Sequence, residues 1–132
     1  MEKTKKYIIT ASILGALAVI LGAMSAHALE SVLDQDSLTA FKTASRYQMY
    51  HALAFLILAA LTKHMNQRIS KWIYNLMLTG TILFCGSIYL LTTEPVFGID
   101  FKFLGPVTPL GGLILIISWI LIGVAAIKKE SD

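Results

Sequence analysis

The chain has 132 residues, of which 56% are hydrophobic and only 14% are charged, and its mean hydropathy of +0.70 excludes an ordinary soluble domain. A net charge of +3 can indicate an anionic partner such as nucleic acid. The basic residues stand at the ends of apolar stretches, however, which is typical of membrane topology, so we expect no nucleic-acid partner.

Four apolar stretches fill most of the chain, at residues 7–29, 47–62, 72–91 and 109–127, with short polar connectors between them. At a rise of about 1.5 Å per residue, about twenty helical residues cross a hydrocarbon core about 30 Å thick. The sequence therefore predicts an all-α integral membrane four-helix bundle in the lipid bilayer. We expect a single domain over residues 1–132, because no connector is long enough to fold alone.

The beginning of the chain also resembles a cleavable secretory signal. Three lysines precede an apolar run that ends in the small-residue sequence of residues 26–28. The run is long for a signal core and has the length of a span, so we expect it to remain as the first span.

Small side chains recur every three or four residues along this first stretch: Ala11, Gly15, Ala18, Gly22 and Ala26. Helices in lipid associate through close backbone approach, which small residues allow. The stripe predicts packing against a neighbouring helix; a cofactor groove is the alternative. Gly111 and Gly112, next to Pro109 in the fourth stretch, predict a second close contact.

The connectors on the predicted outer side carry apolar patterns of their own. Asp36 or Ser37 could cap a helix in which Leu38, Phe41 and Ala44 form one apolar stripe. This predicts a short interfacial helical extension, starting near Ser37, that runs into the second span. Residues 96–107 alternate apolar and polar side chains, which predicts an extended segment at the membrane surface, anchored by phenylalanines, with a gating lid as the alternative.

Lysine and arginine counts predict the orientation. If the N-terminus is cytoplasmic, eight of these residues fall on the inside and three on the outside. Short cytoplasmic loops favour Lys and Arg, so we expect both termini in the cytoplasm. The only cysteine, Cys85, lies within the third stretch, so no intrachain disulfide is possible.

Polar side chains are expected to gather in the outer leaflet of this bundle: His27, Arg46, Tyr47, Gln48, His51, Ser87 and Thr108. The spacing from Tyr47 to His51 places Tyr47, Gln48 and His51 on one helix face. Our interpretation is a hydrogen bond between His27 and His51 that fixes the register of the first two helices.

Three other interpretations of this cluster stay open. A metal site would lack ligands beyond the two histidines, and a proton relay would need a path across the membrane. A small-molecule or lipid-headgroup pocket would use Arg46 to meet an anion.

Several segments resemble one family: residues 22–29, 47–53, 83–90 and 108–112, together with Trp119. They are similar to the YgdD/YwdK-type family of small bacterial four-span membrane proteins, a domain of unknown function. The resemblance implies four helices in the bacterial cytoplasmic membrane. It implies no activity.

We therefore predict a non-enzymatic helix-bundle module, as a homo-oligomer or as an accessory subunit of a larger membrane complex, without cofactor, metal or catalytic residues. The alternative is a binding or transport protein for a small solute or lipid headgroup that acts as an oligomer. No predicted span core holds an acidic residue for proton coupling. Catalysis is not favoured, since Ser25 and His27 point to different helix faces.

Overall fold

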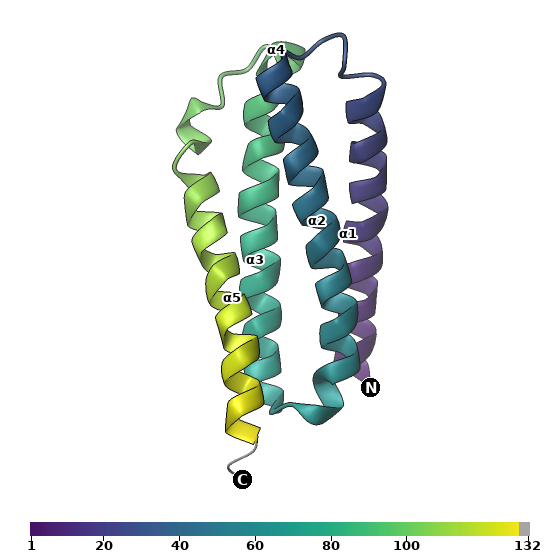
Figure 1. Cartoon of the computed structure of the whole chain (residues 1–132), viewed down its shortest axis with the longest axis vertical. Helices are drawn as coiled ribbons and strands as arrows, with labels where there is room; N and C mark the ends of the chain where they lie inside the picture. Colours follow the sequence, from purple (N-terminus) through teal and green to yellow (C-terminus); the bar gives the residue numbers. More distant parts are fainter. Residues whose placement is uncertain (130–132) are drawn as a thin grey trace.

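The computed structural model describes residues 1–129, and every regular element in that part of the chain is helical (Figure 1). The four long helices are α1 (Glu2–Ala26), α2 (Gln35–Leu61), α3 (Gln67–Thr92) and α5 (Val107–Lys129). Three short elements connect them: η1 (Thr62–His64), α4 (Glu94–Phe97) and η2 (Lys102–Leu104). The last three positions of the domain predicted over residues 1–132 lie outside the described residues.

The long helices lie side by side, and each runs antiparallel to the next (Figure 1). Contacts join α1 to α2, α2 to α3, and α3 to α5, so α2 and α3 are the inner pair. The start of α1 and the end of α5 lie at the same end of the molecule, and α4 lies at the opposite end (Figure 1).

Three segments are long and apolar enough to cross a membrane by length and composition: α1, α3 and residues Lys102–Lys128. The fourth long helix, α2, is not among them within the described residues. Its first half carries the polar and charged residues that form the predicted helical extension.

The helical conformation predicted for the extension of the second helix is confirmed, and it starts at Gln35, two residues before Ser37. The cap is Asp34 rather than Asp36 or Ser37, because the Asp34 carboxylate accepts the backbone N–H of Ser37 at 2.9 Å. The side-chain stripe Leu38–Phe41–Ala44 is buried, as the spacing predicted.

Helix α1 ends at Ala26, within the predicted apolar stretch of residues 7–29. The chain turns there and packs the buried Leu29 and Leu33 against Leu38 and Phe41. Residues 96–107 are not extended: α4 and η2 make helical turns, joined through Gly98 with a φ of 65°. A left-handed residue breaks the alternation that an extended segment needs.

Close backbone contacts fix α5 on α3. A methyl group added at Gly111 would lie 2.4 Å from the Phe84 backbone nitrogen, and one at Gly80 would lie 2.8 Å from the Leu115 side chain. Glycine at these positions lets the two helix backbones meet. A methyl group at Gly112 would meet the Phe84 ring at 3.6 Å, an ordinary contact.

The stripe of small residues on α1 packs against α2. Methyl groups added at Gly15 and Gly22 would lie 3.7 Å from Ala52 and Ser45, respectively. Ala26 is exposed at the end of the helix, and the buried small residue there is Ser25.

Apolar side chains form two clusters at different heights. The larger one contains Phe55, Leu58, Ile73 and Met77 near the end where the chain begins, and the smaller one contains Leu38 and Phe41 near the opposite end. On α2, residues 42–53 lie between the two clusters, and this interval contains the polar side chains described next.

Candidate functional site

Helix α2 buries three polar side chains between the apolar clusters, Ser45, Gln48 and His51. Gln48 and His51 are each 4% exposed, because their three-residue spacing places both on the face that also buries Ala44, Ala52 and Phe55.

The neighbouring polar residues of α2 point elsewhere. Arg46 is exposed and does not join the buried pair, although the sequence placed it in the same cluster. Tyr47 is 43% exposed, and its ring packs on Phe84 and Tyr50.

Gln48 joins three helices. Its Nε2 donates to the backbone carbonyl of Leu14 on α1 at 2.8 Å, and its Oε1 accepts the hydroxyl of Tyr89 on α3 at 2.7 Å. Both the donor and the acceptor atom of this amide are therefore bonded to another helix.

His51 joins α2 to α5. The indole Nε1–H of Trp119 donates to His51 Nε2 at 3.1 Å, and the two rings meet edge to face. Because an indole nitrogen can only donate, Nε2 must accept, which leaves the proton on Nδ1. That nitrogen lies 2.7 Å from the Tyr47 carbonyl and donates to it.

These bonds make α2 the helix to which the other three long helices are tied. We call Gln48, His51, Tyr89 and Trp119 the α2 hub. Every buried side-chain nitrogen or oxygen in residues 1–129 has a hydrogen-bond partner.

Gln48, His51 and Trp119 lie near the middle of their helices, whereas Tyr89 lies in the last turn of α3. Gln48 is the middle residue of α2, and Leu14 is the middle residue of α1. Tyr47 lies twelve residues, about 18 Å, from the start of α2. The outer-leaflet position of the cluster stays a prediction.

The other two hydroxyls of the predicted cluster form a separate bond. Ser87 on α3 and Thr108 at the start of α5 lie 2.6 Å apart, and Ser87 also donates to the Phe84 carbonyl at 3.1 Å. This pair adds a polar tie to the glycine contacts between α3 and α5.

The predicted hydrogen bond between the two histidines does not form. His27 is exposed at the end of α1, and both ring nitrogens of His51 are bonded to other groups. Their positions along the chain predicted that the two histidines lie close together, but the sequence does not determine the path of the connector at residues 27–34.

Trp119 was missed as a site residue, and Tyr89 was not singled out as a partner of Gln48. Tyr89 is four residues from Cys85, on the buried side of α3, and that spacing was an available signal. Trp119 is 50% exposed on an apolar helix, and no local pattern marks it as a partner for His51.

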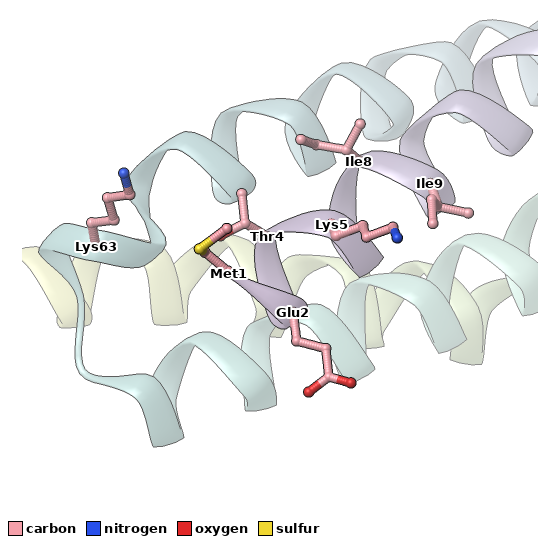
Figure 2. A pocket seen from close by; sticks show the side chains of 7 residues that line it. All are labelled: Met1, Glu2, Thr4, Lys5, Ile8, Ile9 and Lys63. Carbon is pink, nitrogen blue, oxygen red and sulfur yellow. The ribbon is translucent and has the colours of Figure 1, made fainter.

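One cavity borders the α2 hub at Trp119, and another lies at the end of the bundle. A groove of about 60 Å³ between α2 and α5 has only apolar walls besides Trp119. A pocket of about 580 Å³ lies at the end where the chain begins (Figure 2). No group of three or more His, Cys, Asp or Glu side chains within residues 1–129 is arranged to hold a metal ion.

Comparison with known proteins gives the family. Residues 21–112 match the model of the family described as "Protein of unknown function (DUF423)". The chain belongs to the DUF423 family. This confirms the resemblance seen in the sequence, and the four segments that carried it lie within or overlap the helices α1, α2, α3 and α5.

Curated relatives cover nearly the whole chain. The UPF0382 membrane protein YwdK of Bacillus subtilis is 40% identical over 128 residues, which is 94% of this chain and 98% of YwdK. The Staphylococcus aureus relative SAB0533 is 36% identical over 94% of this chain and 97% of its own length. The Schizosaccharomyces pombe relative C1782.12c is 38% identical over 83% and 91%, respectively.

No solved structure matches the chain. The family match, together with three apolar helices of spanning length, makes the chain a membrane protein of a family whose description states no activity.

Proposed function

We propose that this chain is a non-enzymatic four-span module of the bacterial cytoplasmic membrane, with both termini in the cytoplasm. It works as a subunit of a homo-oligomer or of a larger membrane complex.

The observation that carries this proposal is the use of the polar atoms in the α2 hub. The Gln48 amide and the His51 imidazole bond to α1, α3, α5 and their own helix. A catalytic or transport site needs polar groups that are free to meet a ligand, whereas a packing module uses such groups to hold its helices together.

The crossing of α2 is supported by its length and its position. Its 27 residues correspond to about 40 Å of helix, and it lies between α1 and α3, which are both of spanning length. Gln48 and His51, near the middle of α2, are bonded to α1, α3 and α5, as polar groups within a membrane require.

The charges at the end where α1 begins support the proposed orientation with both termini in the cytoplasm. Lys3, Lys5, Lys63, Arg68 and Lys71 lie in the first turns of α1, in η1 and in the first turns of α3. Lys and Arg in short segments favour the cytoplasmic side, so this end is cytoplasmic.

The face of α2 that points away from the bundle favours association with another protein. Thr39, Lys42, Thr43, Arg46 and Tyr50 lie at positions i, i+3, i+4, i+7 and i+11 of one helix face and are exposed or half-buried. We call these five residues the α2 polar face. Exposed leucines and isoleucines stand on α1 and α5, and a polar face within a membrane prefers protein to hydrocarbon.

Co-purification tests the proposal. The tagged chain is extracted in a mild detergent after brief cross-linking, next to a copy with a second tag. We expect the second copy or one defined partner in a fixed ratio. Arg46→Gln should lower that recovery several-fold, and Lys102→Gln, which removes a charge outside α2, should leave it unchanged.

Recovery of a lone monomer, with and without cross-linking, would contradict the proposal. Equal recovery with Arg46→Gln and Lys102→Gln would show that the α2 polar face is not the surface of association.

A further inference from the structure

A pocket lies between the start of α1 and the segment that follows α2. Its volume is about 580 Å³, and its lining residues come from α1 with its preceding residue and from η1 (Figure 2): Met1, Glu2, Thr4, Lys5, Ile8, Ile9 and Lys63.

The walls of this pocket are held together by side-chain bonds. Thr62 donates to the Ala59 carbonyl, so its oxygen accepts the hydroxyl of Thr4 at 3.1 Å, which ties α1 to η1. Lys3 donates to Gln67 at 3.3 Å, and Gln67 donates to the Thr62 carbonyl at 2.9 Å. The pocket therefore has walls from two fixed segments.

The lining combines two cations with apolar side chains. Lys5 and Lys63 come from different elements and lie at different sides of the pocket, while Ile8 and Ile9 form an exposed apolar wall (Figure 2). This pairing fits a ligand with an anionic group and a hydrocarbon part.

The apolar wall continues along α1. Lys5 is followed at four-residue spacing by Ile9, Ile13 and Leu17, and these three side chains are 45–55% exposed. The distance from Lys5 to Leu17 is about 18 Å. Half of a hydrocarbon core about 30 Å thick is about 15 Å, so the stripe has the length of one acyl chain.

We propose that this pocket binds the headgroup of an anionic phospholipid, with its phosphate between Lys5 and Lys63 and one acyl chain along Ile9, Ile13 and Leu17. Basic side chains at a membrane surface attract such lipids. Glu2 also lines the pocket, with its side chain directed away from Lys63 (Figure 2). Its negative charge favours a headgroup with a single phosphate over a multiply charged one.

Native mass spectrometry of the full chain in detergent tests this site by titration with phosphatidylglycerol and phosphatidylcholine. We expect one phosphatidylglycerol to bind in clear preference. Lys5→Gln/Lys63→Gln should bind it about thirtyfold more weakly, since each lysine contributes about a factor of five. Ile9→Trp, which narrows the pocket and keeps both lysines, should also weaken it.

Arg68→Gln/Lys71→Gln is the matched control, because it removes two cations at the same end that do not line the pocket. It should change the affinity less than twofold. Equal losses in both double variants would show a general attraction to the basic end and would overturn the site. Glycerol phosphate binding as tightly as the lipid would overturn the acyl-chain contact.

This result is independent of the subunit proposal, since lipid binding is measured on the isolated chain.

Discussion

Gln48 on α2 is bonded to α1 and α3, so its substitution should weaken the packing of these three helices. Gln48→Leu removes the bonds to Leu14 and Tyr89 at nearly constant volume and leaves the Tyr89 hydroxyl without this partner. Side-chain hydrogen bonds between membrane helices contribute about 0.6 kcal/mol on average. We therefore expect the free energy of unfolding in detergent to fall by about 1–2 kcal/mol.

Tyr50→Phe is the control, because Tyr50 is exposed on the same helix. A double-mutant cycle of Gln48→Leu with Tyr89→Phe isolates the bond between the two side chains. Additive losses would mean that this bond contributes nothing.

Asp34 gives the start of α2 a dependence on pH. The backbone N–H and the hydroxyl of Ser37 bond to its carboxylate and lower its pKa below the ordinary value. A lowered pKa stabilises the folded state above the ordinary pKa of aspartate, about 4, and this contribution is lost as the pH falls through the lowered value. The melting temperature of the wild type should therefore fall more steeply below about pH 4 than that of Asp34→Asn, whose side chain caps the helix but does not titrate. Parallel pH curves would exclude this role.

At the scale of the helix, the contact between α3 and α5 depends on Gly111. An added methyl group would collide with the backbone of Phe84, which a change of rotamer cannot relieve. Overpacking of this kind costs about 1–3 kcal/mol. Gly111→Ala should lower the melting temperature in detergent, whereas Gly123→Ala, in open space on the same helix, should leave it unchanged or raise it slightly. Equal melting temperatures for the two variants would contradict the close contact.

Hydropathy predicted the helices where every face is apolar. The apolar stretches at residues 72–91 and 109–127 lie within α3 and α5, because long apolar runs need no knowledge of the neighbours. On α2, the polar face interrupts the run, and only the spacing of Leu38, Phe41 and Ala44 indicated that the helix begins earlier. The connector at residues 96–107 was missed because the left-handed Gly98 sets its path.

The candidate site was predictable along one helix and not between helices. The spacing of Gln48 and His51 predicts a shared face, and the structure buries both. Trp119 depends on the rotation of α5 about its axis, which an evenly apolar sequence does not determine. The four-residue spacing of Cys85 and Tyr89 indicated the side of α3 but not the partner on α2. Gly111 and Gly112 indicated a close contact but not the helix that makes it.

At the scale of the whole molecule, the proposed orientation makes a prediction for labelling in intact cells. Cys85 is buried, and Cys85→Ser gives a background without other thiols. In that background, Lys102→Cys should react with a membrane-impermeant maleimide, and Lys63→Cys should react only after permeabilisation. Both side chains are exposed, so access depends on the side of the membrane. The reverse pattern would show that the bundle has the opposite orientation in the membrane.

The composition of α2 has a consequence for how the protein is made. The segments around α1, α3 and α5 are apolar enough to enter a bilayer individually, but α2 carries Lys42, Arg46, Gln48 and His51 in its first three-quarters. Such a segment partitions poorly when it leaves the ribosome alone. We expect α2 to remain at the insertion machinery until α3 is synthesised, because Tyr89 supplies one of the partners that shield its polar atoms from lipid.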